Sequence, residues 1–325
     1  MTGSGVPRQG ATLPARAGVH EVPVTVLGDG RPLTLTVHVV TGRRPGPKLV
    51  MFGSIHGDEP LSSEIIRRTL GALSPSALSG TIVAVPVANP LAHQTLTRNT
   101  PLDGCNLNRI FPGDRVGTVS EQLAAVLSAI LRDGATHFID FHSGGNFAFV
   151  DYSYLHDPGA EMSRAFGRPL LYAHDSYEGT STGYALSLGI PSMVSELAGG
   201  SQRIGEYLRY GVEGAFRVLR VIGMLEPGPV VDLPPQRIVE TLTVLRPTVA
   251  GTLLSQYDAA TVGDSVPEGS VLGVVIDPYT FEELEVIRAP YSPSILVLVR
   301  AEVTHVLPGD YGFMVADGAT ARLAG

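Results

Sequence analysis

Hydrophobic and polar positions alternate with a period of two near the start of the chain and with a helical period further along. Residues 21–40 alternate on both sides of "GDGRP", which predicts a β-hairpin, and Pro23 indicates an edge strand. Unbroken apolar runs predict buried strands, and apolar residues three and four apart predict helices. The predicted strands are 48–53, 80–90, 136–142 and 190–196, and the predicted helices are 60–73, 120–132 (with Ser120 as N-cap) and 202–224.

This alternation predicts an α/β fold, with a mixed sheet covered by helices on both faces. In such sheets, functional groups gather beyond the carboxyl ends of the strands. His56 and Glu59 follow the first predicted strand, and Asn89, His142 and Glu196 end the next three. We therefore expect these side chains to lie near one another.

The pattern changes after residue 224. Residues 224–236 are rich in proline and predict a linker, and short alternating runs separated by glycine and proline follow. We therefore expect a mobile tail at 1–20, a first domain at 21–230 and a small all-β domain at 238–325.

Composition excludes some classes of partner. The chain has 325 residues, of which 44% are hydrophobic and 17% charged, as in ordinary globular proteins. A net charge of −8 without a basic patch disfavours nucleic acid. No run approaches the roughly 20 apolar residues of a membrane helix, and the N-terminus lacks the apolar core of a signal peptide. Cys105 is the only cysteine, so no intrachain disulfide forms. We predict a cytoplasmic protein.

The stretch "GSIHGDEP" places a histidine and a glutamate in one short turn. Catalytic zinc commonly takes two histidines and a glutamate and keeps one position for water. Pro60 disfavours a helical conformation at Glu59, so His56 and Glu59 form a loop pair rather than a helical H-E-x-x-H motif. The alternative is that both are ordinary polar loop residues, because H-x-x-E alone is a weak motif.

His142 is the natural third ligand, since it ends a later strand of the same sheet. Asp140 lies two residues earlier on the same strand face, where it could orient a ligating imidazole. With nine histidines in the chain, a strand can also end in histidine by chance.

Two arginines lie in the stretch between residues 88 and 114. Arg109, beside Asn108, could clamp a carboxylate with two hydrogen bonds. Arg98 could stabilise charge that develops on a carbonyl oxygen. The alternative, which spacing supports equally well, is that one or both arginines form structural ion pairs with nearby acids such as Asp103.

Four motifs in a fixed order carry a resemblance to a known family. "GSIHGDEP", "NLNRIFPG", "DFHSGG" and "VSELAGG", within about residues 45–200, resemble the succinylglutamate desuccinylase/aspartoacylase family, which has a zinc carboxypeptidase-like fold. "DGCNLNRIFPG" is similar to the branch that includes diaminobutyrate deacetylases of ectoine breakdown. Asn106 stands where many members have aspartate, a difference between branches that bears on substrate charge rather than chemistry.

The resemblance implies one Zn²⁺ per chain and a role for each matching residue. The implied roles are zinc ligation by His56, Glu59 and His142, general base and then acid catalysis by Glu196, binding of a substrate carboxylate by Asn108 and Arg109, and polarisation of the scissile carbonyl by Arg98.

The C-terminal part resembles the half-barrel of biotinyl and lipoyl carrier domains. Such a carrier needs a lysine to modify, and Lys48 is the only lysine in the chain. A carrier role is therefore excluded. We expect this part to narrow access to the zinc cleft or to mediate assembly.

These observations predict a zinc amidohydrolase that cleaves the amide of a small N-acylated amino acid or related amine. The expected partner is a small acylated substrate with a carboxylate, not a nucleic acid or a membrane, and a homo-oligomer is left open. Two alternatives remain: a zinc carboxypeptidase acting on short peptides, and a non-catalytic metal- or ligand-binding protein. Glu196 argues against the latter, because binding alone needs no base.

Overall fold

The structure, a computed structural model, describes residues 13, 14, 16–229 and 231–324. Most of the predicted tail lies outside the described residues, and its last three residues already belong to strand β1, which begins at Gly18. No helix in the described part of the chain is long and apolar enough to cross a membrane.

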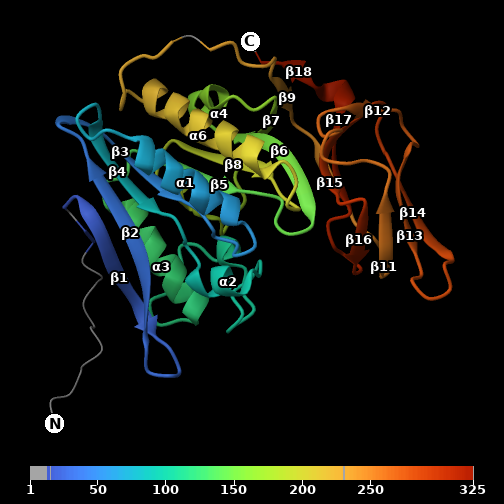
Figure 1. Cartoon of the computed structure of the whole chain (residues 1–325), viewed down its shortest axis with the longest axis horizontal. Coiled ribbons are helices and arrows are strands. Elements are labelled where there is room, and N and C mark those ends of the chain that lie inside the picture. The colour runs from blue at the N-terminus through green and yellow to red at the C-terminus, as the bar shows by residue number, and fades with distance from the viewer. Residues whose placement is uncertain (1–12, 15, 230, 325) are drawn as a thin grey trace.

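A large mixed sheet runs through the molecule in the order β1-β2-β4-β3-β5-β8-β6-β15-β17-β10 (Figure 1). Its first seven strands in that order are β1 (Gly18–Val26), β2 (Pro32–Thr41), β4 (Ser79–Val85), β3 (Arg44–Phe52), β5 (His137–His142), β8 (Ser192–Ala198) and β6 (Ala148–Leu155). The predicted hairpin is confirmed as the antiparallel pair β1–β2 at the edge of the sheet, with an irregular register at Pro23. β4, β3, β5 and β8 are parallel.

Helices cover both faces of this sheet, as predicted. Alternating residues of β3 point to opposite sides: Leu49 and Met51 join the core beneath α1 and α6, and Val50 and Phe52 join the core beneath α3. The helices are α1 (Pro60–Ala72), α2 (Pro90–Thr95), η1 (a 3-10 helix, Leu107–Arg109), α3 (Val119–Arg132), α4 (Ala160–Phe166), α5 (Ser181–Ser187), α6 (Ile204–Val221) and η2 (a 3-10 helix, Gly318–Thr320).

Several details differ from the sequence-based prediction. The strand predicted at 80–90 ends at Val85, and Asn89 is instead the N-cap of α2, where its side chain accepts from the Ala92 amide. Thr118, not Ser120, is the N-cap of α3: its hydroxyl accepts from the Glu121 amide, and the Glu121 carboxylate accepts from the Thr118 amide at 2.7 Å. The Ser120 hydroxyl instead donates to Asp103 at 2.9 Å. The segment between 148 and 187, which holds β6, α4, β7 (Leu170–Ala173) and α5, also escaped prediction.

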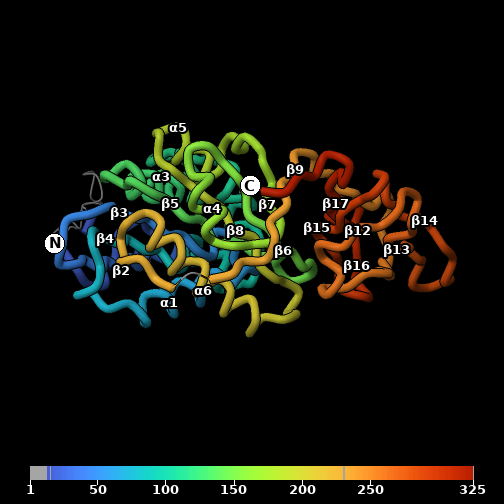
Figure 2. The backbone as a smooth tube through the Cα atoms, turned by 90° about the horizontal axis from the view of Figure 1, so that it is seen from above, coloured from blue at the N-terminus to red at the C-terminus, as the bar shows by residue number. Residues whose placement is uncertain are grey.

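The C-terminal strands are divided between two sheets. β11 (Gly251–Ser255), β13 (Val271–Ile276), β14 (Glu283–Arg288) and β16 (Val303–Val306) form a separate antiparallel sheet at the end of the molecule opposite β1 (Figures 1 and 2). The remaining strands extend the main sheet or pair at its margins: β10 (Leu242–Leu245), β15 (Ser294–Arg300), β17 (Phe313–Asp317), β9 (Arg237–Val239), β12 (Ser265–Val266) and β18 (Arg322–Leu323).

β15 is the strand that joins the C-terminal part to the rest. It pairs antiparallel with β6, so one sheet continues across the junction. The described residues of the predicted linker 224–236 contain neither helix nor strand. The limits of the two domains stay a prediction.

Candidate metal centre and cleft

Parallel strands bring the predicted site residues to one edge of the sheet. Phe52, the last residue of β3, pairs with Asp140 of β5, and His142 pairs with Glu196 of β8. The loop after β3 packs against α2 at Gly57, where a Cβ atom would lie 1.9 Å from the backbone carbon of Ala92. Only glycine permits this approach, which holds the His56–Glu59 loop beside the ends of the neighbouring strands.

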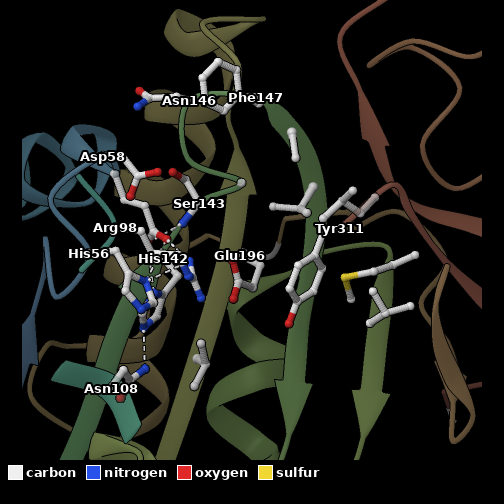
Figure 3. A pocket seen from close by; sticks show the side chains of 18 of the residues that line it. His56, Asp58, Arg98, Asn108, His142, Ser143, Asn146, Phe147, Glu196 and Tyr311 are labelled. Carbon is white, nitrogen blue, oxygen red and sulfur yellow. Dashed lines mark hydrogen bonds and ion pairs between the residues drawn. The ribbon is translucent and has the colours of Figure 1, made fainter. Parts of the chain in front are cut away.

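Three buried side chains converge on one point. The Nδ1 atom of His56 lies 2.8 Å from one oxygen of Glu59, and the Nδ1 atom of His142 lies 2.9 Å from the other. Their potential ligand atoms lie within 4.8 Å of one another. Figure 3 shows the two histidines side by side at one wall of the cleft. These residues form a candidate metal centre.

The outward nitrogens of both imidazoles are held by other residues. Nε2 of His56 lies 3.1 Å from the Asn106 side-chain oxygen, which also accepts from the Asn108 amide. Nε2 of His142 lies 3.1 Å from Asp140, which also accepts from the Ser181 hydroxyl. An Nε2 proton donated outward leaves the Nδ1 lone pair facing Glu59.

The donor set fits a divalent metal ion. Burial lowers the pKa of His56 to about 4, so this imidazole is neutral. Burial alone would raise the pKa of Glu59, but the two imidazoles hold it well below its usual range. Burial likewise opposes the charge on His142, yet Asp140 and Glu59 raise its pKa. Two histidines and a glutamate whose ligand atoms lie within 4.8 Å of one another are a common zinc set.

Two more charged groups complete this wall. A terminal nitrogen of Arg98 lies 3.3 Å from Glu59 and equally far from the His56 Nδ1 atom. Glu196 lies beside the histidines on the neighbouring strand β8, where it is the register partner of His142 (Figure 3). Burial raises the pKa of Glu196 to about 8, and the nearby charge of His142 acts against this shift.

Asn108 and Arg109 differ in how free their side chains are. Asn108 is buried: its side-chain oxygen accepts from the Ser181 amide at 2.9 Å, and its nitrogen lies 3.3 Å from the His142 Nε2 atom. Arg109 is exposed, and one guanidinium nitrogen donates to the backbone oxygen of Asn108 at 2.7 Å. Both line the cleft, but Arg109 has the greater freedom to meet a ligand.

The cleft has a volume of about 910 Å³ and is lined by residues of both the first and the C-terminal part of the chain. Its floor is one face of the main sheet, where alternate residues of β8, β6 and β15 point the same way. These residues are Val194, Glu196, Val150, Tyr152, Leu298 and Arg300.

Residues of the C-terminal part escaped sequence analysis. Tyr311 reaches into the cleft and faces Glu196 in Figure 3. Arg246, Arg300 and His305 also line the cleft. No motif marks these positions, because only the pairing of β15 with β6 brings them to the site. Cys105 is absent from the cleft lining, and burial with nearby Asp103 raises the pKa of its thiol.

Comparison with known proteins agrees with this architecture. A profile of the succinylglutamate desuccinylase/aspartoacylase catalytic domain matches residues 45–222. Over 277 residues the chain is 28% identical to the N-alpha-acetyl-L-2,4-diaminobutyric acid deacetylase of Halomonas elongata, covering 80% of this chain and 75% of that protein.

Solved structures of similar proteins superpose over nearly the whole chain. A succinylglutamate desuccinylase/aspartoacylase from Rhodobacter sphaeroides is 25% identical with a TM-score of 0.80, covering 93% of this chain and 96% of that one. The product-bound ectoine utilization protein EutE (DoeB) from Ruegeria pomeroyi shares the fold, with a TM-score of 0.81 at 23% identity and coverage of 95% and 98%.

The fold and the site define an α/β protein with a candidate metal centre at the carboxyl ends of parallel strands. Because the family profile spans more than half of the chain, the protein belongs to the succinylglutamate desuccinylase/aspartoacylase family. This confirms the resemblance seen in its four sequence motifs.

Proposed function

We propose that this protein is a zinc-dependent amidohydrolase that removes the acyl group from a small N-acylated amino acid or related amine carrying a carboxylate. The observation that carries the proposal is the convergence of two Nδ1 atoms on the Glu59 carboxylate, with Glu196 beside them on the neighbouring strand, where it is the register partner of His142. Family membership and the similarity to a diaminobutyric acid deacetylase support amide cleavage of small acylated amino acids.

His56, Glu59 and His142 would hold the zinc ion, one per chain. When bound, zinc acts as a Lewis acid and lowers the pKa of water from about 15.7 towards about 7. Asn106 and Asp140 orient the imidazoles through their Nε2 atoms, at 3.1 Å in both cases.

Glu196 is the proposed proton carrier. Its carboxylate takes the proton of the attacking water and then gives a proton to the leaving amine. Burial raises its pKa to about 8 in the protein without metal. A bound cation would lower that value towards neutrality, where a group can both accept and donate a proton.

Positive groups at the same wall bind the substrate. Arg98, beside Glu59, can stabilise negative charge that develops on the carbonyl oxygen. Arg109 can clamp the substrate carboxylate, and Asn108 positions Arg109 through its backbone oxygen.

The form of the cleft favours small substrates over long peptides. The C-terminal strands form one of its walls, which brings Tyr311 opposite Glu196. This supports the expectation that the C-terminal part narrows access to the site. A cytoplasmic location and the assembly state stay predictions.

The test is a hydrolysis panel of N-acetyl and N-succinyl amino acids, acetylated diaminobutyric acid and short peptides, with products identified by mass. We expect release of the acid from one small acylated compound, and loss of that release with a zinc chelator. Cleavage confined to peptides would favour a carboxypeptidase. A protein that holds zinc but cleaves no member of the panel would favour a non-catalytic role.

A further inference from the structure

Arg300 is a buried arginine that forms no ion pair with any acid among the described residues. It ends β15, and it is 7% exposed. Its Nε atom is buried and has no hydrogen-bond partner among the described residues. One terminal nitrogen donates to the His305 backbone oxygen at 3.1 Å. Buried charges in proteins are normally paired with an opposite charge. This guanidinium has no such partner among the described residues.

The nearest acid does not supply that counter-charge. Asp310 raises the pKa of Arg300 slightly against the larger lowering effect of burial, yet no ion pair joins the two in the described part of the chain. The Asp310 carboxylate accepts instead from the Leu307 amide at 3.0 Å. The Arg300 guanidinium also lies over the Phe147 ring, whose centroid is 5.5 Å from the guanidinium carbon.

Arg300 lines the floor of the cleft, at the end of β15. Strand register gives its place relative to the reacting groups: Arg300 pairs with Ala148, whereas Glu196 pairs with Tyr152 of the same strand β6. Four residues of a strand span about 13 Å. An anion at Arg300 therefore lies several bonds from the amide that Glu196 would act on.

We propose that Arg300 forms a second anion site of the cleft, which binds a carboxylate remote from the scissile amide. The ligand class is a small dicarboxylate, or an acylated amino acid with a carboxylate at the far end from the metal centre. Planar guanidinium groups match carboxylates through paired hydrogen bonds. The inference deepens the proposed function, on which it rests for the identity of the substrate but not for the binding itself.

The site is tested by equilibrium binding, which needs no turnover. Zinc-loaded protein is titrated calorimetrically with succinate, glutarate and adipate, and with the monocarboxylates butyrate, pentanoate and hexanoate as length-matched probes. We expect at least one dicarboxylate to bind about tenfold more tightly than its matched monocarboxylate, as for a hydrogen-bonded charge pair. Equal Kd values across all pairs overturn the proposal.

Variants assign the preference to one residue. Arg300→Met should abolish it, and Arg300→Lys should lose most of it because an ammonium lacks the paired donors. The control is Arg288→Met, an exposed arginine on β14 whose guanidinium contacts the Gly269 backbone. If Arg300→Met does not fold, the Arg300→Lys variant decides. A folded variant with wild-type dicarboxylate affinity overturns the proposal.

The binding test and the hydrolysis panel distinguish failure of the anion site from failure of the proposed function. A dicarboxylate preference that depends on Arg300 establishes the anion site even if no panel compound is cleaved. Hydrolysis of a panel compound, together with equal Kd values for every dicarboxylate and its matched monocarboxylate, keeps the proposed function and removes the second site.

Discussion

Glu59 links the two halves of the candidate metal centre. One of its oxygens meets His56 and the other meets His142, and the amide of Ser143 donates to it at 3.1 Å. Its side chain is 1% exposed, so water cannot screen these charges. A buried carboxylate between two imidazoles is a costly arrangement for stability alone, and a bound cation offsets that cost.

The first prediction concerns Glu196. Glu196→Gln keeps the shape of the side chain but removes its ability to take a proton. We expect kcat to fall about a hundred- to ten-thousand-fold, with the zinc content unchanged by mass spectrometry. Glu213→Gln, an exposed residue of α6, is the control and should keep full activity. A Glu196→Gln enzyme with wild-type turnover would contradict the proton-carrier role.

The second prediction concerns Asn106. Its side-chain oxygen fixes the His56 imidazole through Nε2, so Asn106→Ala frees that ring. We expect zinc affinity, measured by competition with a chelator, to drop about ten- to a hundredfold. Asn99→Ala removes an exposed amide from the preceding loop and should leave affinity unchanged. Unchanged zinc affinity in Asn106→Ala would mean that packing alone orients His56.

At the scale of elements, the loop between β3 and α1 determines where His56 and Glu59 lie. This loop crosses α2 at Gly57, and the Gly57 amide donates to the Thr97 backbone oxygen at 2.9 Å. The same contact ties the metal loop to the segment that carries Arg98. A shift of this loop would therefore move groups on two sides of the centre.

The third prediction follows from that contact. Gly57→Ala places a Cβ atom 1.9 Å from backbone of α2, so the loop must move. We expect a loss of about 3 kcal/mol in the free energy of unfolding, and weaker zinc binding. Chemical denaturation measures the first and chelator competition the second. Gly71→Ala, in α1 with open space around it, should not destabilise the protein. Equal stability of the two variants would remove Gly57 from this role.

Sequence patterns predicted the parallel part of the sheet well, because its strands are continuous apolar runs that end in polar residues. The ends of β3, β5 and β8 were placed within two residues, and with them His142 and Glu196. The N-cap of α3 was misplaced because Ser120 and Thr118 are both good capping residues. The local sequence does not show that the Ser120 hydroxyl donates to the Asp103 carboxylate instead of capping the helix.

The C-terminal wall of the cleft was not predictable in the same way. Arg300 and Tyr311 sit on short strands or turns without motifs, and their place depends on long-range pairing with β6. Proline-rich residues between 224 and 236 suggested a separate domain, which hid the continuity of the sheet. The resemblance located the candidate metal centre, whereas only the structure shows which residues enclose it.

For the whole molecule, the C-terminal strands complete the main sheet rather than only cover it. Leu296 and Val299 of β15 and Phe313 of β17 belong to the same hydrophobic core as Phe141 and Phe149. Without β15, the first residues of β6, Ala148–Val150, would become an exposed edge. The two parts of the chain therefore share both a core and a cleft.

The fourth prediction tests this shared core by truncation. A chain of residues 1–236 should lose cooperative thermal unfolding and tend to aggregate, because it exposes β6 and apolar residues of the core. Circular dichroism and light scattering measure both properties against the full chain. A truncated chain that unfolds cooperatively and binds zinc would show instead that the first domain folds independently.

The most direct test of the central claim is a titration of zinc into the chelator-treated full chain, with the hydrolysis rate followed on the best panel substrate. We predict no hydrolysis without zinc and a linear rise that saturates at one equivalent per chain, with no such rise in Glu59→Gln. Full hydrolysis by the metal-free protein, or a rise that is equal in Glu59→Gln, would contradict the claim that His56, Glu59 and His142 hold a catalytic metal ion.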